Sequence, residues 1–155
     1  SQLNLERLAL VNHGPVEQLY KDVLKTAQST KIDNNQYLSD LSWVKHNFAH
    51  VHSGIEALKL ICWKQTWIME SGKLNMAEAS VAKVYGSEFF IEAYRLLMEV
   101  TGELSILKND SDLTILNARL ERMYRTASIL TFGGGTNEVQ RDIIAMAGLL
   151  MPRTR

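Results

Sequence analysis

Residues 38–62 read LSDLSWVKHNFAHVHSGIEALKLIC, and their apolar side chains recur at steps of three and four. Such steps place side chains on one face of an α-helix, whereas a half-buried strand alternates at every second residue. The apolar positions are Leu38, Leu41, Val44, Phe48, Val51, Ile55, Leu58 and Cys62. The pattern predicts one long helix from about Asn34 to Ser71, and Gly72 is a plausible C-terminal stop.

The segments on either side show the same helical period. A first helix is expected from about Asn4 to Thr26, with Gly14-Pro15 bending it rather than ending it. A polar loop follows from Ser29 to Asn35. A third helix is expected from about Asn75 to Thr101, and Gly102 ends it.

The C-terminal third repeats this alternation of helix and turn. A polar turn at 108–112 precedes a helix from about Leu113 to Leu130, and a last helix runs from about Thr136 to Leu149. Few segments alternate as a strand would, so the predicted class is all-α. The layout is an antiparallel bundle of four long helices plus a short C-terminal helix. With no linker rich in Pro, Gly or Ser, residues 1–155 are predicted to form one domain.

Composition excludes some partners. Of 155 residues, 46% are hydrophobic, which is enough for one buried core. Lys plus Arg number 17 and Asp plus Glu 17, so no net field favours nucleic acid. No apolar run approaches the roughly 20 residues that span a bilayer, and the start has no signal-peptide pattern. We therefore expect no nucleic acid, no membrane and a cytoplasmic location.

Three features of the sequence are expected to be structural rather than functional. His46 and His50 share a helix face, but a di-iron bundle needs Glu-x-x-His, which does not occur, so no metal site is predicted. Cys62 is expected to be a packed thiol. Three tryptophans are expected in the core or at a subunit interface rather than in a ring-binding platform: Trp43, Trp63 and Trp67.

The run from Phe132 to Arg141, FGGGTNEVQR, joins a flexible hinge to a helix start. Gly133, Gly134 and Gly135 permit a positive φ and the close approach of a ligand to the backbone. Thr136 and Asn137 are residue types that cap a helix. The arrangement suits a phosphate or the edge of a flavin, and a plain turn is the alternative.

The run Gly-Thr-Asn-Glu-Val-Gln-Arg at 135–141 resembles the C-terminal signature of acyl-CoA dehydrogenases. The opening run Leu3-Asn4-Leu5-Glu6-Arg7 resembles the start of the same family's C-terminal domain. The resemblance implies FAD as cofactor, an acyl-CoA thioester as substrate, a separate electron-transfer acceptor and tetramer-type oligomers. It also implies that the N-terminal helical and middle β domains of a parent enzyme are absent here, so the fragment alone is expected to self-associate and to be inactive.

Members of the family place their catalytic Glu either directly before the Gly-Thr of the signature or before the Arg of the first helix. This chain has Gly134 at the first position and Glu6 at the second. The resemblance therefore implies that Glu6 removes the α-proton while hydride leaves the β-carbon for flavin N5. Desolvation would raise the pKa of such a carboxylate and strengthen it as a base. The alternative role for Glu6 is to complement the helix dipole. The missing side chain at Gly134 would leave room for a branched or bulky acyl group.

Further site residues follow from the same resemblance. Arg7 would lie near the thioester, and Gly135 would present its backbone to it. Gln36 falls where the family contacts the neighbouring flavin. The flavin itself would be bordered by Thr136, Asn137 and Glu138.

The resemblance has two departures. Lys25, Gln28 and Ser29 stand where the family has Arg-x-x-Phe-Gly, and a Gly-Gly-x-Gly run is reduced to the sequence at 99–102, EVTG. Loss of an Arg fork and of a glycine pair weakens pyrophosphate binding. The alternative reading is thus a non-catalytic partner subunit or assembly module of a heteromeric acyl-CoA dehydrogenase.

Overall fold

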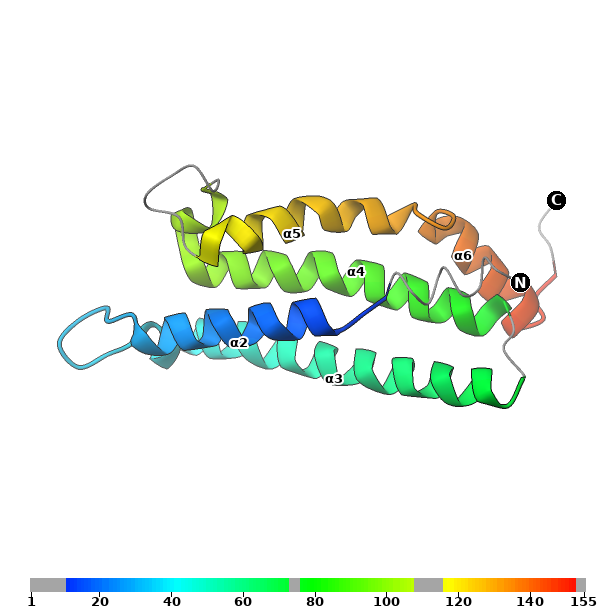
Figure 1. Cartoon of the computed structure of the whole chain (residues 1–155), viewed down its shortest axis with the longest axis horizontal. Helices are drawn as coiled ribbons and strands as arrows, with labels where there is room; N and C mark the ends of the chain where they lie inside the picture. Colours follow the sequence, from blue (N-terminus) through cyan, green and yellow to red (C-terminus); the bar gives the residue numbers. More distant parts are fainter. Residues whose placement is uncertain (1–10, 73–75, 108–115, 153–155) are drawn as a thin grey trace.

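The computed structural model describes residues 11–72, 76–107 and 116–152. In these ranges the chain forms a bundle of roughly parallel and antiparallel helices, with a shorter helix at one end (Figure 1). The helices are α2 (Gly14–Ser29), α3 (Ser42–Glu70), α4 (Met76–Thr101), α5 (Arg119–Ala127) and α6 (Asn137–Ile143). Short 3₁₀ turns cover Leu38–Asp40, Gly102–Ile106, Leu116–Ala118 and Ser128–Thr131, and a π-turn covers Ile144–Gly148. No strand occurs in the described ranges, so the all-α prediction is confirmed.

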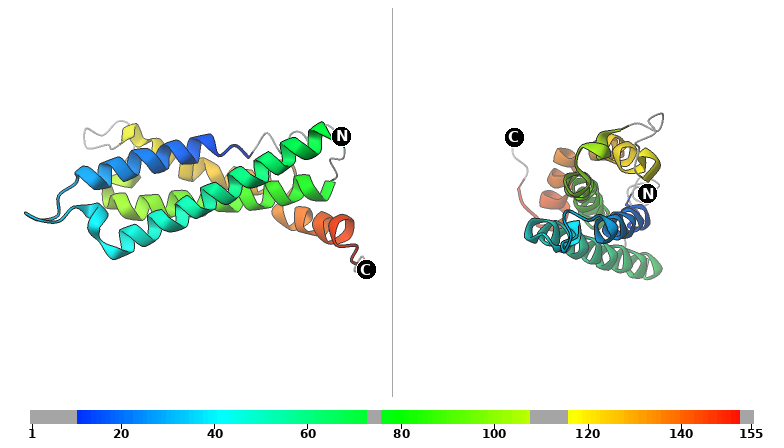
Figure 2. Two further views of the ribbon diagram at one scale, coloured as in Figure 1. Left: turned by 90° about the horizontal axis from the view of Figure 1, so that it is seen from below. Right: turned by 90° about the vertical axis from the view of Figure 1, so that its left-hand side faces the viewer.

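Helix α4 is the centre of the bundle, packed against α2, α3, α5 and α6. Figure 2 shows it enclosed by the others when the bundle is viewed end-on. Small residues such as Ala79, Ala82 and Ala93 are buried along it and let neighbouring helices approach closely. Most of its faces are therefore covered, including positions that carry polar side chains.

The expectation of a bent first helix is wrong. Residues 11 and 12 are not helical, and α2 begins at Gly14 with Pro15 in its first turn. Proline is well tolerated there because a first-turn N–H has no partner inside the helix. The residue before a proline is also biased away from helical geometry. Gly14-Pro15 therefore marks a helix start.

Helix α3 begins eight residues later than expected. The loop between α2 and α3 folds back on itself, with the Leu38 N–H donating to the Thr30 carbonyl at 2.9 Å. The Asp40 carboxylate then accepts from the Tyr37 N–H at 2.9 Å, which stabilises the 3₁₀ turn before α3. These local polar bonds compete with the helix. The predicted glycine stops at the C-terminal ends of α3 and α4 are confirmed, because Gly72 and Gly102 have φ values of +67° and +64°.

Helix α5 is shorter than the expected segment from Leu113, whose first residues lie outside the described ranges. Its N-cap, Ala118, has a φ of +51°, which breaks the helix from the turn before it. A 3₁₀ turn at Ser128–Thr131 continues the chain to the hinge. The fourth bundle helix is thus a short α-helix with 3₁₀ extensions.

The tryptophans do not lie in the core. Trp43, Trp63 and Trp67 are 47%, 65% and 69% exposed, so only the interface part of that prediction remains. Cys62 is half-buried, its Sγ lies 3.5 Å from the Val11 carbonyl oxygen, and burial raises the pKa of its thiol. A packed thiol is therefore confirmed for Cys62.

Two further findings concern metal and membrane. No group of three metal-ligating side chains occurs within the described ranges. His46, His50 and His52 lie exposed on α3, and the ring of His52 stacks on Tyr20. Among the helices described, none combines the length and apolar character that a membrane crossing requires.

Candidate functional site

The glycine hinge connects the 3₁₀ turn after α5 to the start of α6, at the end of the bundle opposite the α2–α3 loop (Figure 1). Gly134 has a φ of +72° and Gly135 a φ of +100°, conformations that side chains rarely adopt. The Gly135 N–H donates to the Phe132 carbonyl at 3.1 Å, which closes a tight turn. The positive φ values therefore explain why glycine is favoured at both positions.

The hinge passes directly into a capped helix. The Thr136 hydroxyl accepts from the Val139 N–H at 3.3 Å, which confirms the predicted N-cap. Hydrogen bonds from the Glu138 backbone N–H and then the Thr136 hydroxyl lower the pKa of the Glu138 carboxyl. Gly135, Thr136 and Glu138 are exposed, so all three are accessible to a ligand.

The side chain of Asn137 points into the bundle, toward α4. It is 4% exposed, and its amide donates to Ser87 Oγ at 3.0 Å and to the Glu88 carboxylate at 3.1 Å. Its Oδ1 accepts from the Lys83 amino group at 2.6 Å. Both amide donors are used inside the protein, so the predicted flavin contact of Asn137 is open to its backbone alone.

Gln140 of α6 contacts the hinge from inside the bundle. It is fully buried, its Oε1 accepts from Ser80 Oγ at 2.8 Å, and its Nε2 donates to the Gly134 carbonyl at 3.2 Å. A Cβ on Gly135 would lie 2.6 Å from Gln140 Nε2. The side chain of Gln140 thus occupies the space that a residue larger than glycine would need.

An apolar cavity of about 280 Å³ lies between the start of α2, the middle of α4, the end of α5 and the 3₁₀ turn that precedes the hinge. Its wall includes Pro15, Phe90 and Tyr94, together with Met123 and Leu130. Burial raises the pKa of Tyr94 to about 12, against a smaller opposing effect of Arg119, so the phenol stays neutral. Sequence reasoning missed this cavity, although the four-residue step from Phe90 to Tyr94 is a signal for a shared helix face.

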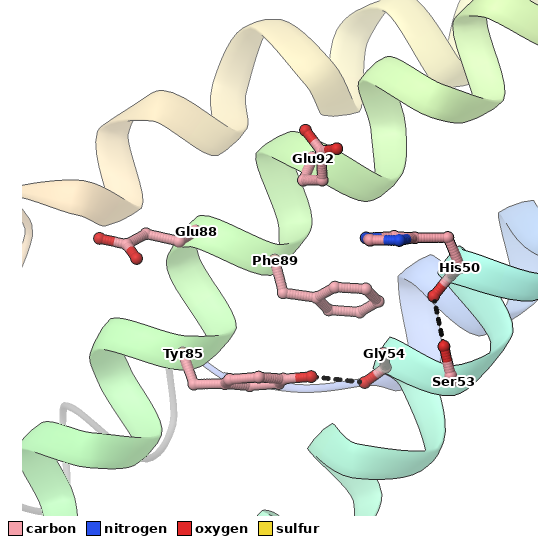
Figure 3. Close-up of a pocket in the computed structure, with 7 residues that line it drawn as sticks. All are labelled: His50, Ser53, Gly54, Tyr85, Glu88, Phe89 and Glu92. Atoms are coloured by element: carbon pink, nitrogen blue, oxygen red, sulfur yellow. Dashed lines mark hydrogen bonds between the residues drawn. The ribbon is translucent and has the colours of Figure 1, made fainter. Parts of the chain in front are cut away.

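A second hollow of about 420 Å³ lies between α3 and α4 (Figure 3). Phe89 lies across it between the two helices, and the Tyr85 hydroxyl donates to the Gly54 carbonyl at 3.3 Å. The hydrogen bond from Arg95 is the main cause of the lowered pKa of Glu92, and the charge of His50 adds to it. Arg95 thus holds the carboxylate at the rim in its charged form.

The other predicted site residues lie apart from the hinge. Gln36 is half-buried in the α2–α3 loop, where its carbonyl accepts from the Ile32 N–H at 2.9 Å. Figure 1 shows this loop at the far end of the bundle, so one chain does not bring Gln36 and the hinge together. Glu6 and Arg7 lie outside the described residues. Any site that uses Gln36 and Gly135 together therefore needs two chains.

The two departures from the family pattern are visible at that same end. Lys25 is exposed on α2. The Glu99 carboxylate pairs with Arg95 and accepts from the Asn47 amide at 3.1 Å, so its charge is fixed on the bundle surface.

The fold is a helical bundle in which a glycine hinge leads into a capped helix. The sequence model of the family described as "Acyl-CoA dehydrogenase, C-terminal domain" matches residues 1–149, and the chain belongs to this family. The resemblance read from the two terminal motifs is thereby confirmed.

Two curated relatives come from Mycobacterium tuberculosis. The chain is 48% identical to acyl-CoA dehydrogenase FadE26 over 157 residues, covering 99% of this chain and 39% of that protein. It is 32% identical to acyl-CoA dehydrogenase FadE29 over 154 residues, covering 99% of this chain and 38% of that protein. The chain thus spans about two fifths of the length of these relatives.

Solved structures show the same bundle. The crystal structure of the ChsE4-ChsE5 complex from Mycobacterium tuberculosis matches with a TM-score of 0.89 at 48% identity, over 99% of this chain and 40% of that one. The structure of the Tcur3481-Tcur3483 steroid ACAD matches with a TM-score of 0.90 at 35% identity, over 99% of this chain and 39% of that one. Both structures are named for a pair of proteins, ChsE4-ChsE5 and Tcur3481-Tcur3483.

Proposed function

We propose that this chain is the C-terminal bundle of a larger FAD-dependent acyl-CoA dehydrogenase that works together with a second, different subunit in the cytoplasm. The proposal rests on the backbone of the half-buried Gly134 and the exposed Gly135, which carries no side chains. Hydrogen bonds from Gln140 of α6 and Lys83 of α4 hold this segment in place. Membership of the family gives that backbone its expected role beside a thioester and a flavin.

The residues present fit one edge of a flavin rather than the whole of it. Gly135, Thr136 and Glu138 expose backbone and polar atoms, while Phe132 and Val139 are 59% and 50% exposed and offer apolar contact to a ring. Gln36 would serve the flavin of a neighbouring chain. The bound flavin would supply a two-electron acceptor for the β-hydride, and a separate electron-transfer protein would reoxidise it.

The role proposed for Glu6 is that of the base. Its carboxylate would take the α-proton, and Arg7 beside it would lie against the thioester. The backbone at Gly135 would be presented to the same thioester. Gly134 carries no carboxylate, so the hinge position that holds the base in other members of the family cannot supply it here.

For the substrate we propose a bulky acyl-CoA, and the similarity to the Tcur3481-Tcur3483 steroid ACAD supports this proposal. Gly134 carries no side chain, and the apolar cavity at Pro15 and Tyr94 is lined in part by the 3₁₀ turn that precedes the hinge. Such a cavity favours apolar groups through the hydrophobic effect.

Anaerobic bleaching of the flavin tests this proposal. The full-length protein, prepared with its partner subunit, would be mixed with straight short-chain, branched and polycyclic acyl-CoA thioesters. Fastest bleaching by a branched or polycyclic thioester is expected. A preference for a straight short chain would contradict the bulky-substrate proposal, and a failure of every thioester would contradict the dehydrogenase itself.

The second candidate is a non-catalytic partner subunit, favoured by the carboxylate of Glu99 and by Lys25 at the far end of the bundle. Flavin content separates the two candidates. A complex whose flavin lies entirely in sites lacking this chain's hinge would support the partner-subunit role.

A further inference from the structure

Lys83 is a fully buried lysine in the first third of α4. Burying an amino group is costly unless its donors find hydrogen-bond acceptors. The Lys83 amino group donates to the Thr131 carbonyl at 2.9 Å and to Asn137 Oδ1 at 2.6 Å. Its donors are therefore directed at two points of the chain far away in sequence.

Those two points are the two ends of the hinge. Thr131 is the last residue of the 3₁₀ turn that precedes the hinge, and Asn137 is the first residue of α6. A single amino group thus joins the two ends of the segment 132–136. This segment contains the two glycines with positive φ.

Two serines on the same face of α4 extend this contact. Ser80 and Ser87 stand three residues before and four residues after Lys83, and both are at most 1% exposed. The Ser80 hydroxyl donates to Gln140 Oε1, and Gln140 Nε2 in turn donates to the Gly134 carbonyl. Ser87 Oγ accepts from the Asn137 amide. We call Ser80, Lys83 and Ser87 the hinge-support strip.

We propose that Lys83 is a positioning residue, which fixes both ends of the glycine hinge so that Gly134 and Gly135 present one backbone geometry to the thioester and the flavin edge. A chain of three glycines has many accessible conformations, and only an external constraint selects one of them. Small displacements of groups that orient a substrate slow the chemical step. This consequence for catalysis rests on the proposed function, whereas the effect on the hinge does not.

Lys83→Met in the full-length protein with its partner subunit is the test, because Met keeps the length of the side chain and removes its donors. Amide hydrogen exchange of residues 132–136 is expected to become at least about tenfold faster, while exchange in α2 and α3 stays unchanged. The kcat for the best thioester is expected to fall by about tenfold or more, with KM changed by less than about twofold. Lys64→Met, which removes an exposed lysine paired with Glu78, is the matched control and should change neither quantity.

Ser87→Ala is the second variant, because Lys83→Met could prevent folding. It removes one acceptor of the Asn137 amide, so a smaller rise of exchange confined to the hinge is expected. Unchanged hinge exchange in a folded variant, or an equal rise throughout α2 and α3, would overturn the positioning role. If none of the thioesters bleaches the flavin of the wild-type protein, the proposed function fails. The exchange data still decide whether Lys83 fixes the hinge.

Discussion

Gly135 combines a φ of +100° with a close neighbour, since a Cβ there would lie 2.6 Å from Gln140 Nε2. Gly135→Ala should therefore lower the free energy of unfolding by about 1–2 kcal/mol from the backbone term alone. Displacement of Gln140 from the Gly134 carbonyl adds to this loss. Urea denaturation measures the change.

Gly72→Ala is the matched control for Gly135→Ala. Gly72 has a φ of +67°, but nothing lies within 4 Å of its Cβ position. The variant should thus lose only the backbone term. An equal loss in both variants would show that Gln140 does not constrain the hinge.

Glu17 gives the bundle a pH dependence at acid pH. The hydrogen bond from Lys21 is the main cause that lowers the pKa of Glu17 to about 2, and Lys59 adds to it against desolvation. Because the folded state favours the carboxylate, this contribution is complete above about pH 4.5 and is lost as the pH falls toward 2. Glu17→Gln should make the thermal midpoint less dependent on pH in this window, as measured by circular dichroism. The same pH dependence in wild type and variant would contradict this account.

At the level of elements, the contact between α3 and α4 depends on Gly54. A Cβ there would lie 2.1 Å from the Phe89 ring, which fills the space between the two helices. Gly to Ala inside a helix otherwise stabilises by about 1 kcal/mol. Gly54→Ala should instead destabilise by about 1–3 kcal/mol through overpacking.

Chemical denaturation checks the Gly54 prediction, with the neighbouring exposed Ser53→Ala as the control. The control should stay within about 0.5 kcal/mol of wild type. A Gly54→Ala protein that is more stable than wild type would show that Phe89 moves aside without cost.

Periodicity and glycine positions were sufficient to predict the extents of α4 and the end of α3, because those signals act locally. The start of α3 was wrong, since Asp40 and the loop backbone bind each other in a way that no apolar pattern records. The start of α2 was wrong because Gly14-Pro15 fits both a kink and an N-terminus. Packing around Val11, beside Gly86 and Cys62, decides between them.

For the whole molecule, the exposed apolar side chains of α3 matter most. Trp63 and Trp67 are each about two thirds exposed, as is Leu60 near them on the same helix. The chain of residues 1–155 is expected to self-associate through this face, because burial of large aromatic surfaces favours association. Trp63→Lys with Trp67→Lys should shift it toward the monomer by analytical ultracentrifugation, whereas His46→Lys on α3 should not. A monomeric wild-type chain would contradict this expectation.

The site was predicted in part. The hinge and its cap were recognisable from glycine chemistry, and the role of Glu6 stays a prediction. The hinge-support strip was not recognised, because a lysine and two serines inside a helix are typical of a solvated face. Their burial comes only from the central place of α4 in the bundle.

The most direct test of the central claim is anaerobic flavin bleaching in the full-length complex, wild type against Glu6→Gln. The matched control is Glu17→Gln, which removes a carboxylate on α2. We predict that Glu6→Gln keeps its flavin and bleaches at least about 100-fold more slowly, since a general base contributes at least that factor, and that the control bleaches like wild type. Unchanged bleaching in Glu6→Gln, or a complex with no flavin at this hinge, would contradict the account.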